Sequence, residues 1–268
     1  MHWLQGGKGK MASQTVIVER KANIGLLTLN RPDQLNTFSA QLAKDLNEGL
    51  LEMENDSRVR ALIIKGAGRA FCAGVDLNEI AGKSTLEVRN LIKLIDAYNA
   101  IIINMSKPVI AAVHGAAVAN GFGLAAACDF TVASDDARFG ATAINVGLYC
   151  FGPSAPLSCC LGKKKSLELL LTGDIIDAKE AERIGLVNKV VAREKLEETA
   201  MELAQKLANK SPIALQMGKA SFYKMADMPY EKALAYLTEA FTILATTEDA
   251  KEGIVAFLDK RQPVWKER

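Results

Sequence analysis

The stretch Lys107–Asp129, KPVIAAVHGAAVANGFGLAAACD, determines how this chain is expected to fold. Residues 109–113 are apolar and partly β-branched, His114-Gly115 interrupts the run, and residues 124–128 are small and compatible with a helix. The stretch therefore predicts a strand, a loop and a helix. A helix that starts after a buried strand has unpaired N–H groups in its first turn, and these attract negative charge. The alternative is a tight connection that binds nothing.

A second stretch of the same kind precedes it. Residues 69–77, RAFCAGVDL, follow the apolar segment 61–65 and place the small turn Ala73-Gly74 just after a buried strand. Two such turns can supply two convergent backbone donors. Donors of this kind stabilise a developing oxyanion, and the loss of one typically costs about 3 to 4 kcal/mol of transition-state stabilisation.

With this spacing, the two stretches resemble the crotonase (enoyl-CoA hydratase/isomerase) superfamily. Similar segments cover most of residues 14–265, and they are LNRPDQLNTFS at 29–39, FGATAINVGL at 139–148, LTGDIIDAKEAERIGLVNKVV at 171–191 and FLDKRQPVW at 257–265. The resemblance implies an α/β fold, a crotonase-like spiral of ββα repeats with a helical C-terminal trimerisation subdomain. It also implies a homotrimer or a dimer of trimers.

Local patterns agree with repeated strand-helix units. Strands are expected at 15–19, 24–29 and 61–65, with strand edges at 130–133 and 138–139, and helices at 40–55 and from Ser84 to about residue 104. Ser39 is the expected N-cap of the first helix, and Ser84 with Glu87 forms a capping-box pattern. Residues 147–156 are expected to be irregular and to form part of the pocket wall, and a helix is expected from residue 166.

Three regions are expected along the chain. Residues 1–12 are interpreted as a flexible or expression-derived extension without a secretory signal, residues 13–193 as the ββα spiral that binds acyl-CoA, and residues 194–268 as a helical oligomerisation region. Helices are expected there at 194–209, 212–226, 230–246 and 248–261. Leu234, Leu237, Phe241 and Leu244 are a candidate apolar interface, or equally a core within one subunit.

The resemblance implies an acyl-CoA thioester as ligand, with its oxygen held between the main-chain N–H groups of Val75 and Asn120. Asn120 stands where glycine is common in the family, and asparagine tolerates left-handed backbone geometry. The other substrate-binding positions carried over from the matching motifs are Gln34, Ala73, Asp76, Leu77, Asn78, Gly121, Asn145, Phe151 and Lys260. Lys260 matches a cation that relatives place near the CoA phosphates, and Asp76 is favoured as an ordering residue of its loop.

The two glutamates that hydratases of this family use for proton transfer are absent. Their positions fall on Gly123 and Ala143, and a third family carboxylate position falls on Phe151. In this respect, and in NVGLYCFGP and AFLDKRQPVW, the chain is closest to the enoyl-CoA hydratase domain-containing proteins. If the alignment holds, Gly123→Glu with Ala143→Glu would install crotonyl-CoA hydration. Tyr149 is a candidate acid or a packing residue of the wall.

Two classes of function stay open. The first is an enzyme of the enoyl-CoA hydratase/isomerase family acting on an acyl-CoA, by isomerisation, weak hydration, or hydrolysis or decarboxylation of the thioesterase/decarboxylase type. The second is a non-catalytic acyl-CoA-binding protein. A pocket filled by Phe122, Tyr149 and Phe151 would favour the second class.

Composition excludes several other functions. The 33 Lys and Arg residues balance 31 Asp and Glu residues, so no bulk field recruits nucleic acid, and no apolar run approaches the roughly 18 residues of a membrane span. Five cysteines without a CxxC spacing indicate reduced, mostly buried thiols, hence a cytoplasmic location, with the mitochondrial matrix as the alternative in a eukaryote. Neither a metal nor a separate cofactor is expected. Cys150 lacks an evident base, since His114 is the sole histidine beyond His2.

Overall fold

The computed structural model describes residues 15–267, so the predicted extension 1–12 lies outside the described residues. A six-stranded sheet has the order β1-β2-β3-β4-β6-β9, with only the β1/β2 pair antiparallel. Its strands are β1 (Val16–Lys21), β2 (Ile24–Leu29), β3 (Ala61–Gly66), β4 (Val109–Val113), β6 (Phe130–Ser134) and β9 (Lys189–Val191). A three-stranded sheet joins β5 (Ala116–Val118), β7 (Arg138–Gly140) and β8 (Ile175–Asp177) in the order β5-β7-β8.

Successive units of the chain contribute to both sheets, and this produces the spiral. β4 and β5, and then β6 and β7, are consecutive pairs in which the first strand enters the large sheet and the second enters the small one. Two isolated bridges, Phe38 with Val75 and Cys72 with Ala117, extend the second layer to the earlier units. The predicted α/β fold of ββα repeats is therefore confirmed.

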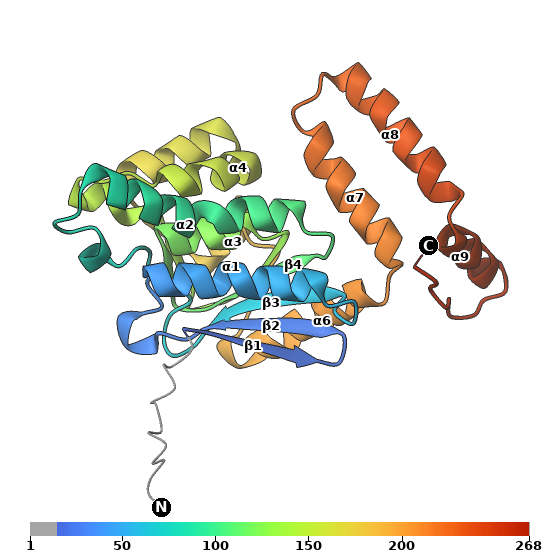
Figure 1. Ribbon diagram of the computed structural model, residues 1–268, viewed down its shortest axis with the longest axis horizontal. Coiled ribbons are helices and arrows are strands. Elements are labelled where there is room, and N and C mark those ends of the chain that lie inside the picture. The colour runs from blue at the N-terminus through green and yellow to red at the C-terminus, as the bar shows by residue number, and fades with distance from the viewer. Residues whose placement is uncertain (1–14, 268) are drawn as a thin grey trace, which may run out of the picture.

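The helices of these units cover one face of the large sheet, as Figure 1 shows. They are α1 (Ala40–Asn55), α2 (Thr85–Asn104), α3 (Asn120–Ala127) and α4 (Phe151–Thr172). Ser39 caps α1 through Leu42 N–H, and Ser84 with Glu87 forms the complete capping box of α2. The main core lies between these helices and the sheet, and its largest fully buried side chains include Tyr98, Phe38, Phe71 and Phe122.

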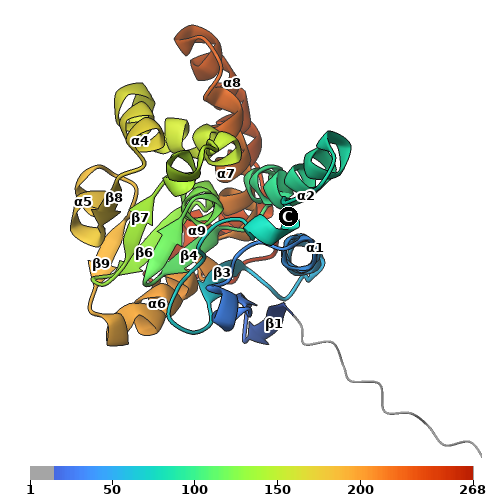
Figure 2. The ribbon, with the colours of Figure 1, turned by 90° about the vertical axis from the view of Figure 1, so that its left-hand side faces the viewer.

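Helix α6 (Leu196–Ala208) covers the opposite face of the sheet. Its Leu196, Ala200 and Ala204 pack with Ile63 and Ile110 of the strands in a separate apolar cluster. Figure 2 shows α6 on the far side of the strands from α1 and α2. Helix α6, the first helix of the predicted region 194–268, therefore completes the core, and the chain leaves the core after Ala208.

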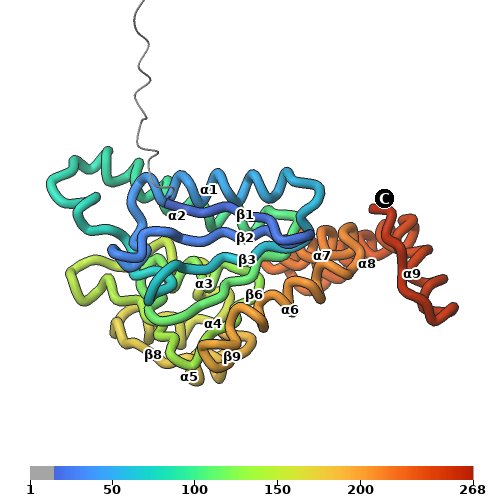
Figure 3. Tube along the Cα trace, turned by 90° about the horizontal axis from the view of Figure 1, so that it is seen from below, coloured from blue at the N-terminus to red at the C-terminus, as the bar shows by residue number. Residues whose placement is uncertain are grey.

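The last three helices form an arm that extends away from the sheets (Figures 1 and 3). They are α7 (Pro212–Met225), α8 (Tyr230–Ala245) and α9 (Glu248–Leu258), close to the predicted ranges. A buried ion pair ties the arm to the core: Lys219 Nζ lies 2.6 Å from Asp129 Oδ2, and Asp129 also accepts hydrogen bonds from Tyr223 Oη and Val109 N. Elsewhere the arm exposes large apolar side chains, such as Phe241 and Phe257.

The region around α4 differs from the sequence prediction. Residues 147–156 were expected to be irregular, but α4 begins at Phe151 and continues past a kink at Gly162 to Thr172. A proline in the first turn of a helix breaks no hydrogen bond, so Pro153 does not prevent an early start. The preceding segment contains the short helix η3 (Thr142–Val146), and the remaining short elements are η1 (Pro32–Gln34), η2 (Leu77–Glu79), α5 (Ala178–Arg183) and η4 (Arg193–Lys195).

Candidate active site

The two turns expected to supply donors lie against each other. A Cβ built on Gly74 would lie 2.8 Å from Ala119 Cβ and 3.8 Å from Asn120 N, and one on Gly121 would lie 2.0 Å from the Cys72 carbonyl oxygen. Only glycine permits this approach, and at Gly74 the φ of +98° also favours it. The loop after β3 is thus packed directly on the first turn of α3.

The N–H groups of Val75 and Asn120 are free to bind a ligand. Among residues 15–267, neither N–H donates to a protein acceptor: Val75 lies between Gly74, whose carbonyl accepts from Phe38 N, and Asp76, whose N–H donates to the Phe38 carbonyl. Asn120 is the first residue of α3, where a helix has no internal acceptor for the N–H. Two adjacent backbone donors of this kind suit a carbonyl oxygen that gains negative charge.

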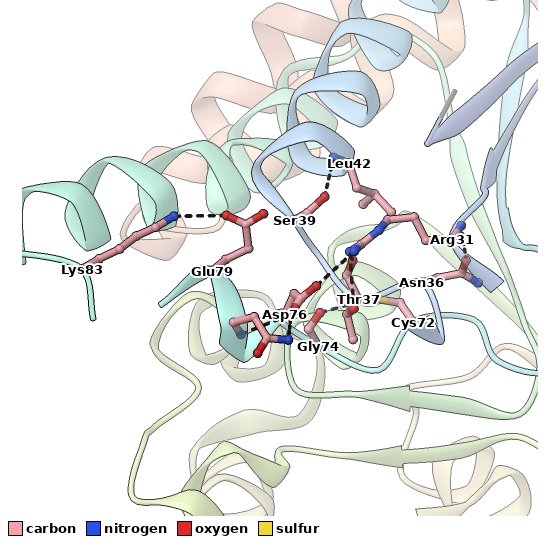
Figure 4. A network of polar contacts seen from close by, with 11 residues as sticks. Arg31, Asn36, Thr37, Ser39, Leu42, Cys72, Gly74, Asp76, Glu79 and Lys83 are labelled. Atoms are coloured by element: carbon pink, nitrogen blue, oxygen red, sulfur yellow. Dashed lines mark hydrogen bonds and ion pairs between the residues drawn. The ribbon is translucent and has the colours of Figure 1, made fainter. Parts of the chain in front are cut away.

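A polar network holds the loop that carries Val75 (Figure 4). Arg31 donates to the Thr37 carbonyl at 2.6 Å and to Asp76 Oδ2 at 3.0 Å, and Asp76 also accepts from Asn78 N and Nδ2. Burial raises the pKa of Asp76, but the hydrogen bonds from Arg31 and Asn78 outweigh it and hold the pKa below its ordinary value. Asp76 therefore remains an anion that orders the loop, the role favoured from the sequence.

A cavity of about 690 Å³ opens beside the two donors. Its walls are mostly apolar and come from the 73–80 loop, from Val88 and Ile92 on α2, from η3, and from the start of α4. This volume is in the range of small-molecule sites. Asp96 is the one charged side chain among the described residues that line it.

Asp96 lies next to Asn120, one of the two donors. The Asn120 side-chain amide donates to Asp96 Oδ1 at 3.1 Å, and a Cβ on Gly152 would lie only 2.1 Å from the same oxygen. Burial raises the pKa of the Asp96 carboxyl above its ordinary value, and the hydrogen bond from Asn120 offsets this only in part. The sequence analysis missed this residue, although Val88, Ile92 and Asp96 recur every four residues and mark one face of α2.

The first glutamate position of the hydratases is filled by other side chains. A Cβ on Gly123 would lie 2.8 Å from Pro153 Cγ and 2.9 Å from the hydroxyl of Tyr98, which is fully buried. Tyr98 Oη donates to the Asn120 carbonyl at 3.3 Å. Gly123 is not part of the cavity wall, and a glutamate there would have to displace Pro153 and Tyr98, so we predict that Gly123→Glu with Ala143→Glu does not install hydration. The second position, Ala143, does line the cavity.

The structure brings together about half of the residues predicted for the site. The cavity is lined by Ala73, Val75, Leu77, Asn120, Tyr149 and Phe151. The others do not line it, and they are Gln34, Asp76, Asn78, Gly121, Asn145 and Lys260.

The positions of Asn145 and Lys260 outside the cavity wall have a clear physical cause. The Asn145 amide donates to the Gly173 carbonyl at 3.4 Å and thus lies against the end of α4. Lys260 follows α9, which lies at the opposite end of the molecule from α4 in Figure 1, so it cannot reach the cavity of its own chain. Gly121 acts instead through its close contact with Cys72.

No cysteine is among the described residues that line the cavity. Burial raises the pKa of the Cys72 thiol to about 12 and also raises that of Cys150. Cys72, Cys128 and Cys150 are buried, whereas Cys159 and Cys160 are exposed, so the thiols are mostly buried, as predicted. Within residues 15–267, no three His, Cys, Asp or Glu side chains gather as a metal site would require. The same residues contain no helix long and apolar enough to cross a membrane.

Comparison with known proteins identifies the family. The family model described as "Enoyl-CoA hydratase/isomerase" matches residues 19–268. The chain belongs to this family. The predicted crotonase membership is therefore confirmed.

Relatives in this family match over nearly the whole chain. A short-chain-enoyl-CoA hydratase of Clostridium acetobutylicum is 37% identical over 254 residues, covering 94% of this chain and 97% of the relative. The mitochondrial enoyl-CoA hydratase domain-containing protein 3 of Rattus norvegicus is 36% identical, covering 89% and 80%.

Solved structures of the family have the same fold. An enoyl-CoA hydratase of Mycobacterium smegmatis has a TM-score of 0.90 at 37% identity, covering 94% of this chain and 98% of that one. Human enoyl-CoA hydratase domain-containing protein 3 also has a TM-score of 0.90, at 34% identity, covering 94% of this chain and 100% of that one.

Proposed function

We propose that this family member binds an acyl-CoA thioester in the cavity and polarises its carbonyl with the N–H groups of Val75 and Asn120. The observation that supports this most directly is the pair of backbone donors without protein acceptors beside a largely apolar cavity. A thioester oxygen between the donors would be stabilised most when it becomes an enolate or a tetrahedral oxyanion. The acyl chain would lie along the apolar wall formed by α2 and η3.

Within the family's chemistry, reactions through the thioester enolate fit this cavity better than hydration. Water addition needs one group to activate water and one to deliver a proton to the α-carbon, and each such group typically contributes about 10² to 10⁴ in rate. Both glutamate positions lack a carboxylate, and the space at Gly123 is taken by Pro153 and Tyr98. Hydrolysis of the thioester would likewise need an activated water.

A second candidate function is acyl-CoA binding without turnover. The observation that favours it is the filled space at Gly123. Against it, the cavity is open: Phe122 is fully buried in the core against Phe139, while Tyr149 and Phe151 stack edge to face in the wall and leave the space between them and α2 free.

The proposal is tested by calorimetry with two ligands that differ only at the carbonyl. Butyryl-CoA has the thioester oxygen, and butyl-CoA, a thioether, lacks it. Wild-type protein should bind the thioester more tightly. Asn120→Pro removes one N–H at a helix position where proline is tolerated, so the preference should shrink by about tenfold or more. Asn120→Ala keeps the N–H and is the matched control. Equal binding of both ligands by the wild type would refute the proposal.

We also propose that the exposed apolar face of the arm, helices α7 to α9, contacts further copies of the chain in a homotrimer or a dimer of trimers. Leu234 and Phe241 are exposed, and Phe241 also lines, with Leu237 and Leu244, a groove between α7 and α8. Phe257, at 82% exposure, is also on this face. Light scattering should give the mass of three or six chains, and Phe257→Glu should lower it. A monomeric wild type would contradict this.

A further inference from the structure

The cavity holds one carboxylate that the family's glutamate positions do not account for. Asp96 projects from α2 into the space beside Asn120, and it is half-buried. Among residues 15–267, no Lys or Arg forms an ion pair with Asp96, in contrast to carboxylates such as Asp76 and Asp129. Its polar contact is the Asn120 amide.

The position of this carboxylate is fixed on two sides. Asn120 supplies both a free N–H for the thioester oxygen and the side-chain amide that holds Asp96 Oδ1 at 3.1 Å. On the other side the carboxylate lies against the bare Cα of Gly152, where a methyl group would fall 2.1 Å from the oxygen. Asn120 therefore carries one oxyanion donor on its backbone and, through its side-chain amide, fixes the position of the Asp96 carboxylate relative to that donor.

Building on the proposed function, we propose that Asp96 is the proton-transfer residue of this site and that it acts at the α-carbon of the bound thioester. With the carbonyl oxygen on the Val75 and Asn120 N–H groups, the α-carbon would be one bond from the carbonyl carbon, in the cavity that Asp96 also lines beside Asn120. The structure thus supplies one base and one oxyanion hole, the minimum set for proton abstraction next to a carbonyl.

The reaction balances without water, metal or oxidant. The Asp96 carboxylate takes the α-proton, the C–H electron pair forms the enolate C=C bond, and the carbonyl π electrons move to the oxygen bound by the two N–H groups. Return of the proton from Asp96 to the α-carbon exchanges it. With a β,γ-unsaturated acyl group, return to the γ-carbon instead gives the conjugated α,β-enoyl thioester, an isomerisation that needs a single carboxylate.

The surroundings of Asp96 suit a base of this kind. Burial raises the pKa of its carboxyl, which makes the carboxylate a stronger base than an exposed aspartate. Among the described residues that line the cavity, the other titratable side chain is Tyr149, and Tyr98 on the same helix interacts electrostatically with Asp96. The contact from α3 is the Asn120 amide. Burial raises the pKa of Tyr98, so that residue stays protonated.

Two assays test the proposal. Mass spectrometry measures the exchange of the α-protons of butyryl-CoA in D2O. Ultraviolet absorbance measures the conversion of 3-hexenoyl-CoA to its conjugated isomer. Asp96→Asn keeps the shape and the acceptor for Asn120 but cannot accept a proton. It should lower both rates by about 10² or more while butyryl-CoA affinity stays near wild type. Glu52→Gln, the same change on the exposed face of α1, should leave both rates unchanged.

Two further readouts separate catalysis from a structural role. The wild-type exchange rate should rise with pH as the Asp96 carboxyl, whose pKa lies above 3.8, loses its proton. This rise should be absent in Asp96→Asn. Because a raised folded-state pKa means that the charged form costs stability, Asp96→Asn should unfold at higher temperature than wild type at neutral pH. This advantage should vanish as the pH falls below 3.8. A purely structural Asp96 would give a less stable variant.

The outcomes distinguish the two proposals. Binding of butyryl-CoA with neither exchange nor isomerisation by the wild type would overturn the role of Asp96 and leave the proposed binding function in place. Unchanged exchange or isomerisation in Asp96→Asn would also overturn it. Absence of both binding and turnover in the wild type would overturn both proposals.

Discussion

Restoring the family's first glutamate should damage this protein rather than activate it. In Gly123→Glu the new Cβ would lie 2.8 Å from Pro153 Cγ and 2.9 Å from Tyr98 Oη. Carbon atoms pack at roughly 3.5 to 4.0 Å, so the side chain overlaps a rigid ring and a fully buried tyrosine. Overpacking of this kind costs about 1 to 3 kcal/mol, and a buried polar group without partners adds about 1 to 3 kcal/mol. The expected loss of unfolding free energy is therefore about 2 to 6 kcal/mol.

Urea denaturation followed by circular dichroism measures this loss. Ala143→Glu is the matched control, since residue 143 lines the cavity and its carboxylate has room, so its cost should stay below about 1 kcal/mol. Neither Gly123→Glu nor the double variant should gain crotonyl-CoA hydration. A Gly123→Glu protein as stable as the control, and active as a hydratase, would show that Tyr98 and Pro153 move aside and would refute this steric argument.

Three other outcomes follow from the same contacts. Ala119, next to the donor Asn120, has a φ of +47°, a backbone conformation that costs an alanine about 1 to 3 kcal/mol. Ala119→Gly should therefore raise the unfolding free energy in urea titrations by about 1 kcal/mol. A lower unfolding free energy in this variant would contradict the strain at Ala119. Arg31→Gln should lower the unfolding free energy by about 1 kcal/mol at pH 7, because it removes the partner of Asp76. The pKa of Asp76 is lowered in the folded protein, so the difference in unfolding free energy from wild type should shrink as the pH falls below 3.8. A difference that does not depend on pH would exclude the ion pair as its cause. Lys219→Met should lower the unfolding free energy by about 3 to 5 kcal/mol, because it leaves Asp129 charged and buried. Hydrogen exchange in α7 should become faster. Unchanged exchange in α7 would mean that the ion pair does not hold the arm against the core.

The sequence predicted those parts of the fold that depend on local patterns. The cap at Ser39, the capping box at Ser84 and the helix ranges of the arm were all close, because capping and apolar periodicity act within a few residues. The start of α4 was missed since Gly152 and Pro153 obscured the helical pattern, although proline is allowed in a first turn.

The sequence located the cavity residues that lie in or beside the two turns and in the segment 149–151, among them Leu77, Tyr149 and Phe151. Val75 and Asn120 were assigned from the family resemblance, at two glycine-containing turns after buried strands, and both line the cavity. Asp96 and Tyr98 were missed because their role depends on how α2 packs against α3 and α4, which no local pattern encodes. The position of Asn145 depends on packing in the same way: its amide donates to the Gly173 carbonyl, and the residue does not line the cavity.

The most direct test of carbonyl polarisation is the infrared difference spectrum of butyryl-CoA labelled with ¹³C at the thioester carbonyl. If the Val75 and Asn120 N–H groups bind the oxygen, the carbonyl stretch should move to lower frequency on binding to the wild type and return most of the way to its solution value in Asn120→Pro. Asn120→Ala should keep the full shift. A bound thioester whose carbonyl frequency equals that in water, or a shift unaffected by Asn120→Pro, would contradict the oxyanion-hole assignment.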